Sequence, residues 1–290
     1  MMKNLLLVST GTMVGHENGF NYKRALAEIY ALREKGLAHG MELMMLKHYY
    51  DKKDAVCEAI SACGVPPYVI HCEKEIGTMI SDSASLDADG RHDEADALYS
   101  YAIDLFRLNC AFGETLSIPR MVLHLWGGRN SDRYVEYNIS KFAELSKIAA
   151  DHGIRILVEN IPSNCHDPMS NWKKLLPYLT DAGLIFDTRF GKLHEQSADI
   201  LTDRELTKRI EHVHVSDFAG KYREFTALRP ILHPGEGTID FSEVFALLRG
   251  IGYEGSVTLE SPIIVGEGLD IEKIEKTLSY IKENLQIQVV

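Results

Sequence analysis

The segment ILVEN at residues 156–160 decides the fold class, because it joins a continuous apolar run to a carboxylate. Such a run is typical of a parallel strand that is buried on both faces. Three later runs also carry an ionisable residue at or near their ends: LIFDT (184–188), HVHVSD (212–217) and VTLES (257–261). The first three of these segments are spaced by about one strand–helix unit each. The spacing therefore predicts that Glu159, Asp187, His214 and Glu260 lie on one rim of a barrel.

The same strand pattern recurs along the whole chain. The apolar runs are Asn4–Val8, Met41–Leu46, Tyr68–Cys72, Met121–Leu125, Ile154–Glu159, Leu184–Asp187, His212–Val215 and Ser256–Glu260. Helix patterns between or after them cover Tyr22–Lys35, Glu94–Cys110, Arg133–His152, Ser242–Arg249 and Ile271–Asn284. We predict a single (β/α)₈ TIM barrel domain over residues 1–290, since such a barrel needs about 250 residues. An open doubly wound sheet usually carries a GxGxxG loop after its first strand, and the sequence has none.

Charge and cysteine usage restrict the partners and the compartment. The net charge of −11 disfavours nucleic acid and acidic membrane surfaces as partners. The five cysteines form no CxxC pair, which favours reduced thiols. No run approaches a membrane span, and the apolar stretch Leu5–Val8 is too short for a signal peptide. We predict a cytoplasmic protein that binds a small molecule, and homo-oligomerisation stays open.

Three carboxylates and one imidazole at adjacent strand ends form a ligand set for one divalent metal ion, either Mn²⁺, Co²⁺, Zn²⁺ or Mg²⁺. Such an ion can bind two oxygens of a hydroxy-ketone or hydroxy-aldehyde and stabilise the enediolate formed on proton loss. Glu159 and Glu260 are the predicted acid/base pair. Moving a proton between carbons gives isomerisation, and returning it to the opposite face gives epimerisation.

Other strand ends and the loop Ser216–Thr238 supply further candidates. His71 and His124 are predicted substrate contacts, with a second metal or simple packing as alternatives. Trp126 and Phe190 either form an apolar wall or pack in the core, and Glu42 either points into the mouth or is a buried ion-pair partner. His212 is expected in a deeper layer than His214. In the loop, Arg223, Arg229 and His233 are candidate substrate residues, in an anion pocket or a solvated turn, and Asp217 is an accessory candidate.

The segments LVEN, FDT, HVHVSDF, HPGEGTIDF and TLESP resemble the xylose isomerase-like barrel superfamily over nearly the whole chain. That superfamily includes sugar-phosphate isomerases, ketose 3-epimerases, inosose dehydratases and endonuclease IV. The resemblance implies metal ligands at Glu159, Asp187, His214 and Glu260, and a carbohydrate substrate. Its members also leave open a dehydratase, an endonuclease IV-like nuclease or a non-catalytic sugar-binding barrel.

Two departures from the family pattern bear on these alternatives. The DTxH pattern of the epimerases reads Asp187-Thr-Arg-Phe190, so the usual histidine is missing unless His194 replaces it. The nuclease's Asp-x-His pair corresponds to Arg229-Pro-Ile231, so its third metal site should not form. His71 and His124 match nuclease ligands, which leaves a second metal open.

Overall fold

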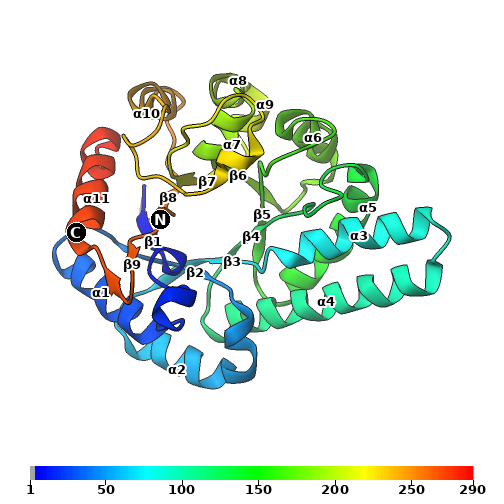
Figure 1. The fold of residues 1–290 in the computed structure, drawn as a ribbon, viewed down its shortest axis with the longest axis horizontal. Coiled ribbons are helices and arrows are strands. Elements are labelled where there is room, and N and C mark those ends of the chain that lie inside the picture. The colour runs from blue at the N-terminus through cyan, green and yellow to red at the C-terminus, as the bar shows by residue number, and fades with distance from the viewer. Residues whose placement is uncertain (1–3, 290) are drawn as a thin grey trace.

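The computed structural model describes residues 4–289, and its centre is a closed barrel of eight parallel strands (Figure 1). The strands are β1 (Leu6–Ser9), β2 (Gly40–Met44), β3 (Pro67–His71), β4 (Arg120–Leu123), β5 (Arg155–Glu159), β6 (Gly183–Asp187), β7 (Ile210–Val215) and β8 (Ser256–Leu259). Each strand pairs with its neighbours in chain order, and β8 closes the barrel on β1. The predicted TIM barrel is therefore confirmed, and each of the eight apolar runs overlaps a strand.

The alternation of side chains along the strands gives the barrel interior its layers. One inward layer is apolar and contains Leu7, Val69, Val122, Leu157 and Ile185, which form a separate buried cluster. The residues two positions later point to the same interior, one layer closer to the carboxyl ends of the strands. On β5 and β6 this step leads from Leu157 to Glu159 and from Ile185 to Asp187. The apolar layer thus forms a floor beneath the polar one.

Helices surround the barrel and cover the outward faces of the strands (Figure 1). They are α1 (Tyr22–Glu34), α2 (Lys53–Ala62), α3 (Glu75–Ala88), α4 (His92–Thr115), α5 (Val135–Asp151), α6 (Pro168–Leu175), α7 (Thr188–Leu193), α8 (Ser197–Thr202), α9 (Arg204–Thr207), α10 (Phe241–Gly250) and α11 (Ile271–Leu285). The five predicted helices correspond to α1, α4, α5, α10 and α11. The sequence analysis did not predict α3, which packs beside α4 as a protruding hairpin.

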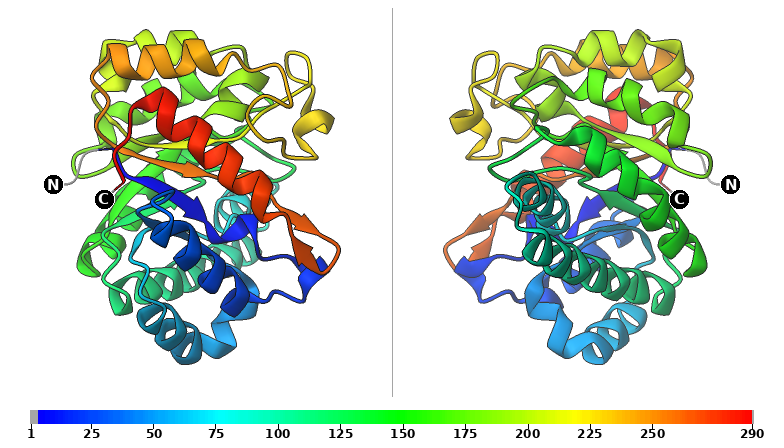
Figure 2. Two further views of the ribbon diagram at one scale, coloured as in Figure 1. Left: turned by 90° about the vertical axis from the view of Figure 1, so that its left-hand side faces the viewer. Right: turned by 90° about the vertical axis from the view of Figure 1, so that its right-hand side faces the viewer.

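Two loops project from the end of the barrel where the strands finish, on the side away from the chain termini (Figure 2). One is the segment after β7, which contains a short 3-10 helix (Phe225–Leu228) and a bridge between Asp217 and Leu232. The other is a small hairpin of β9 (Ile264–Val265) and β10 (Gly268–Leu269). These loops surround the polar layer of the barrel.

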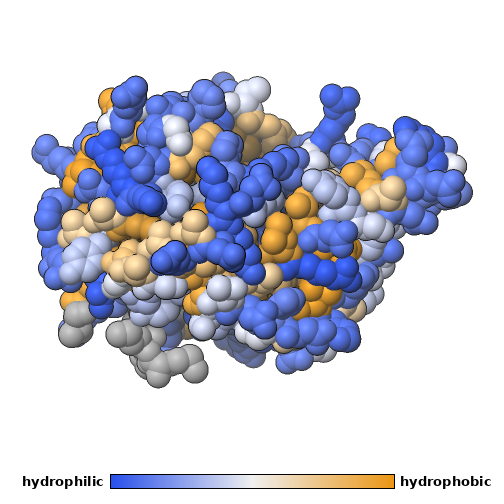
Figure 3. Space-filling view, turned by 90° about the horizontal axis from the view of Figure 1, so that it is seen from below, coloured by the Kyte–Doolittle hydropathy of each residue, from blue (hydrophilic) through white to orange (hydrophobic). Residues whose placement is uncertain are grey.

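The outer surface carries mainly polar side chains. Seen from the side of α1, α2 and α4, it is mostly hydrophilic with smaller apolar areas, and the tip of the α3–α4 hairpin is polar (Figure 3). Among residues 4–289, no helix has both the length and the apolar character needed to span a bilayer.

Candidate metal centre

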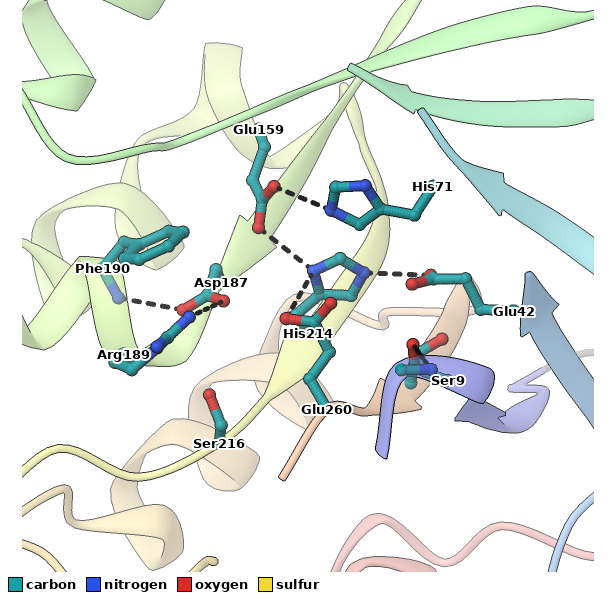
Figure 4. A network of polar contacts seen from close by, with 12 residues as sticks. Ser9, Glu42, His71, Glu159, Asp187, Arg189, Phe190, His214, Ser216 and Glu260 are labelled. Carbon is teal, nitrogen blue, oxygen red and sulfur yellow. Dashed lines mark hydrogen bonds and ion pairs between the residues drawn. The ribbon is translucent and has the colours of Figure 1, made fainter. Parts of the chain in front are cut away.

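The ends of four consecutive strands bring together the four predicted ligands (Figure 4). Glu159, Asp187, His214 and Glu260 each offer one ligand atom, and these atoms all lie within 4.8 Å of one another. Asp187 and His214 are fully buried, Glu159 is 1% exposed and Glu260 is 8% exposed. Glu260 is therefore the ligand most open to the mouth of the barrel.

The donor set fits a divalent cation because several carboxylate oxygens lack a hydrogen-bond donor. Asp187 Oδ2 and Glu260 Oε1 are buried and accept no hydrogen bond within residues 4–289, and Glu159 Oε2 has only the His124 and His71 rings beside it. Glu159 Oε1 and Glu260 Oε2 both approach the same atom, His214 Nδ1, at 3.1 and 3.4 Å. Three carboxylates around one imidazole are costly to bury without a compensating positive charge. A bound cation would supply that charge.

Glu42 fixes the orientation of the His214 ring from beneath. His214 Nε2 lies 2.9 Å from Glu42 Oε2, and His212 Nε2 lies 2.8 Å from the same oxygen. Burial would raise the pKa of Glu42, but the facing imidazoles of His214 and His212 outweigh it and hold that pKa below its usual range. An ionised carboxylate only accepts hydrogen bonds, so Nε2 of His214 carries a proton toward Glu42. Burial opposes charge on this ring, but Glu260, Glu42 and Glu159 raise the pKa of His214 well above its usual value, so Nδ1 is also protonated in the metal-free protein and would give up that proton to a metal ion.

Asp187 is held by backbone contacts at the start of α7. Its Oδ1 accepts the N–H of Phe190 at 2.9 Å, and Asn160 binds both its backbone N–H and its backbone carbonyl. Burial, helped by the carboxylates of Glu159 and Glu260 and opposed by the guanidinium of Arg189, raises the pKa of Asp187 to about 7. Arg189 Nη2 lies 3.9 Å from Asp187 Oδ2. Without a cation, the site is short of positive charge.

The two predicted substrate histidines flank Glu159. His124 Nε2 lies 2.5 Å from Glu159 Oε2, and His71 Nε2 lies 3.6 Å from the same oxygen. Burial lowers the pKa of His124 to about 4, although Glu159 acts in the opposite direction. His71 Nδ1 is already bonded to the carbonyl of Cys72 at 2.9 Å. The Nε2 atoms of both rings therefore lie beside the ligand cluster, and a role in substrate contact stays a prediction.

Several other predicted site residues have structural contacts of their own, and their roles toward a substrate stay predictions. Trp126 is fully buried in the hydrophobic core, which agrees with the packing alternative. Both ring nitrogens of His233 are occupied, by Thr277 Oγ1 and the Pro262 carbonyl, which leaves none for a substrate. Asp217 accepts backbone N–H groups from Gly235, Gly237 and Ile239, so it holds the loop together.

The remaining candidates lie around the ligand cluster. Glu42 is a fully buried ion-pair partner, as one of its two predicted roles requires. His194 Nε2 accepts the N–H of Ser163 at 3.2 Å, so it does not replace the missing histidine among the clustered ligands. Arg223 donates to the carbonyls of Ser163 and Asn164, and Arg229 is exposed at the rim.

The sequence analysis missed two residues that act close to the ligands. Arg189 is 4% exposed and Asn160 is fully buried, and both contact Asp187. Their positions in the sequence could have identified them, because Asn160 directly follows Glu159 and Arg189 lies two residues after Asp187. In a barrel, residues just past a strand end fold back toward the same rim.

Two cavities lie near the cluster. One, of about 280 Å³, includes His124 in its wall, and the other, of about 360 Å³, includes Glu260. Lys74 lines both cavities, so they lie next to one another.

A sequence profile for the xylose isomerase-like TIM barrel matches residues 29–284. The chain belongs to this family. An inosose dehydratase from Yersinia enterocolitica is 28% identical over 160 residues, which cover 50% of this chain and 54% of the relative. An uncharacterised protein from Methanocaldococcus jannaschii is 28% identical over 175 residues, which cover 58% and 55%. The chain spans about half the length of these curated relatives.

Solved structures of other xylose isomerase-like barrels share the architecture over nearly the whole chain. A D-tagatose 3-epimerase-like protein is 19% identical with a TM-score of 0.69, covering 97% of both chains. L-ribulose 3-epimerase is 15% identical with a TM-score of 0.69, covering 99% of this chain and 95% of its own. An IolI protein with a bound zinc atom is 16% identical with a TM-score of 0.69, covering 97% and 98%. At these identities the likeness shows the fold, and these neighbours are mostly sugar epimerases and isomerases.

Proposed function

We propose that the protein is a divalent-metal-dependent isomerase or epimerase of a small sugar or sugar derivative. The observation that carries this proposal is the convergence of Glu159, Asp187, His214 and Glu260, with buried oxygens of Asp187 and Glu260 left without donors. The zinc reported for the IolI neighbour and the epimerase names of other neighbours support it. The ion is one of Mn²⁺, Co²⁺, Zn²⁺ or Mg²⁺, which this mixed oxygen and nitrogen set can hold.

When bound, such an ion polarises a substrate carbonyl and stabilises negative charge that develops on its oxygen. The chain's own groups move the proton. Glu159 and Glu260 approach His214 from strands separated by β6 and β7, so they reach the space above it from different directions. One carboxylate removes a proton from a carbon next to the carbonyl, and the other returns one to that carbon or its neighbour. Asp187 and His214 would keep the metal ion bound during this proton transfer.

Burial by the surrounding walls supports this chemistry. Glu159 is nearly inaccessible to water, and its neighbours His71 and His124 are held by the barrel rather than by flexible loops. A rigid first layer keeps the reacting groups within the short range that proton transfer needs. We infer that His71 and His124 contact hydroxyl groups of the substrate beside Glu159.

The experiment that tests the proposal separates proton transfer from metal binding. Purified protein is incubated with ketoses, aldoses and their phosphates in D₂O, and deuterium incorporation is followed by NMR. Glutamine keeps the shape of glutamate but cannot act as a base near pH 7. Glu159→Gln and Glu260→Gln should each reduce turnover by at least about 10²–10⁴-fold with the metal resupplied in excess.

The matched control is Glu211→Gln, a substitution on the same barrel but at the opposite end of β7, where Glu211 pairs with Arg155. That variant should keep its turnover. Near-normal turnover in metal-saturated Glu159→Gln and Glu260→Gln would show that the two residues are not the acid/base pair.

A dehydratase is the second candidate, because the curated relatives include inosose dehydratases. The same proton removal, followed by loss of a β-hydroxyl as water, would give a dehydrated product instead of a new stereocentre. The NMR experiment distinguishes the two, since dehydration removes a hydroxyl-bearing carbon signal and does not merely exchange a proton.

A further inference from the structure

The cavity beside His124 differs in chemistry from the metal centre that it adjoins. Its volume is about 280 Å³, and its polar or small wall residues include Lys74, Thr78, Gly128, Ser131 and Asn164, with Phe225 as an aromatic wall. No carboxylate lines it among the described residues, although the chain has a net charge of −11. The cavity beside Glu260, by comparison, is also lined by Glu73 and Glu75.

Lys74 is the cation of this cavity, and it is unpaired. It follows β3 by three residues, immediately before α3, and its side chain is partly buried. Within residues 4–289 its ammonium group forms no hydrogen bond or ion pair with a carboxylate. It is near enough to His124 to act against protonation of that ring, as its contribution to the lowered pKa of His124 shows. A lysine beside a buried site and without a protein partner is available for a ligand.

Other polar groups around the cavity are also available as donors. The hydroxyl of Thr78 and the side-chain amide of Asn164 make no hydrogen bond within residues 4–289. The backbone turns at Gly128 with a φ of +65°, and a Cβ there would lie 2.4 Å from Thr78 Cγ2. Glycine is therefore required for the loop after β4 to approach α3 this closely. The approach places Gly128 beside the side chain of Thr78 in the wall of the cavity.

The loop after β7 completes the opposite wall. Phe225 lines the cavity, and Arg223 lies behind it, with its guanidinium carbon 5.9 Å from the Phe225 ring. Arg223 donates to the carbonyls of Ser163 and Asn164, which fixes the Asn164 wall. Lys74 is therefore in the wall of the cavity, and Arg223 adds a second cation behind the opposite wall.

We propose that this cavity binds the anionic end group of the substrate, a phosphate ester or a carboxylate, with Lys74 as the residue that selects it. The inference rests on the proposed function in that it places the reacting carbons of the same molecule at Glu159. Lysine, hydroxyl groups and exposed backbone N–H groups are the donors that such oxygens take. The anion enters beside His124, on the side of the cluster away from Glu260.

The binding test uses inorganic phosphate and protein stripped of metal with EDTA, so that a metal ion cannot bind the phosphate. Line broadening of the ³¹P signal is measured for wild type, Lys74→Met and Lys47→Met, and acetate is titrated in parallel. Lys47 is an exposed lysine on the same rim that lines neither cavity, so Lys47→Met is the matched charge control. Lys74→Met should weaken anion binding by at least about tenfold, the loss expected for one charge-assisted hydrogen bond. Lys47→Met should bind as wild type does.

The two anions identify the end group. Binding of phosphate that depends on Lys74 assigns a phosphate ester, and binding of acetate alone assigns a carboxylate. Absence of binding for both, or equal binding in wild type and Lys74→Met, overturns the proposal. A circular dichroism spectrum and thermal midpoint equal to wild type show that the Lys74→Met protein is folded.

A kinetic measurement keeps this proposal separate from the proposed function. For any sugar that is turned over, Lys74→Met should raise KM for the anionic form and leave kcat nearly unchanged. Anion binding that depends on Lys74 without turnover of any sugar would sink the isomerase proposal and leave the anion site standing. If Lys74→Met left the turnover of anionic sugars unchanged, the anion site would be overturned and the isomerase proposal would stand.

Discussion

At the scale of single residues, Asp187 combines a ligand position with an electrostatic cost. Burial and the neighbouring carboxylates raise its pKa to about 7 in the metal-free protein, above the usual value of about 4. When the pKa of a carboxyl group is higher in the folded than in the unfolded state, its contribution to folding stability falls as pH rises from about 4 to 7. The reason is that the group loses its proton at a lower pH in the unfolded chain. Above that window, ionised Asp187 destabilises the metal-free protein.

We therefore expect Asp187→Asn to stabilise the metal-free protein and to abolish metal binding. The amide removes one negative charge, and its Oδ1 can still accept the Phe190 N–H that begins α7. In EDTA at pH 8, thermal unfolding should shift upward by about 2–4 °C for each kcal/mol of repulsion removed. Elemental analysis without chelator should find about one divalent ion per wild-type chain and little in the variant.

The stability gain should shrink as pH falls below about 6, because wild-type Asp187 then carries a proton. His214→Ala provides the comparison, since it should also lose the metal but leaves a space in the buried layer and destabilises the fold. Equal metal content in wild type and both variants would contradict the ligand assignment.

Glu42 acts on the metal centre through His214 and should not contact the ion. Glu42→Gln leaves every proposed ligand in place but removes the carboxylate that receives the Nε2 proton of His214. Loss of such a partner typically weakens metal affinity by about 10–100-fold. Competition with a fluorescent chelator measures this effect. Glu211→Gln on the same barrel should bind metal as wild type does, and an unchanged affinity in Glu42→Gln would show that the ring needs no such support.

At the scale of elements, Asp217 organises the long loop after β7. Its carboxylate accepts the N–H groups of Gly235, Gly237 and Ile239, so it ties the start of the loop to its end. The Asp217→Asn variant presents an amide NH₂ to some of these donors, and each unsatisfied buried group costs about 1–3 kcal/mol. We expect faster tryptic cleavage after Lys221 and Arg223, with metal content unchanged.

Asp240→Asn is the control for that prediction. Asp240 caps α10 by accepting the Glu243 N–H, and asparagine caps helices nearly as well as aspartate. This variant should be cleaved at the wild-type rate. Wild-type cleavage after Lys221 and Arg223 in Asp217→Asn would mean that other contacts hold the loop.

The strands were predictable from the sequence for a reason that did not apply to α3. A barrel strand is buried on both faces, so it appears as a continuous apolar run. The buried face of α3 instead includes Gly77, Ser81 and Ser83, because the helix packs closely against the loop after β4. Small and polar residues conceal the helical period of hydrophobicity on which the prediction relied.

For the candidate site too, some features follow from local sequence and others do not. Four ligand positions followed from the ends of apolar runs, which is local information. The contact between Glu42 and His214 joins residues far apart in the chain, and the ring nitrogens of His233 are occupied by groups from two other segments. Sequence proximity does not indicate such pairings. For that reason the sequence left two roles open for Glu42 and allowed His233 as a candidate substrate residue.

At the scale of the whole molecule, the net charge and the missing metal ligands both argue against the nuclease alternative. The chain has a net charge of −11, which opposes the phosphate contacts that supply most of the affinity of proteins for DNA. The positions where a third metal would need Asp and His hold Arg229 and Ile231, and none of the metal-capable clusters among residues 4–289 includes them. One further group of possible ligands contains His71, Glu159 and His214. This group would support at most a second ion.

We therefore expect no incision of a duplex that contains an abasic site, at physiological salt and with Zn²⁺, Mn²⁺ or Mg²⁺ supplied. Gel analysis of an end-labelled duplex measures this, with an established abasic endonuclease as the positive control. Lower salt is also sampled, since weaker screening should strengthen the repulsion between an acidic protein and DNA. Glu159→Gln identifies contamination, because cleavage that persists in this variant does not come from the metal centre. Metal-dependent incision that Glu159→Gln abolishes would overturn the sugar assignment, because the acidic surface would then have failed to exclude DNA from the cluster.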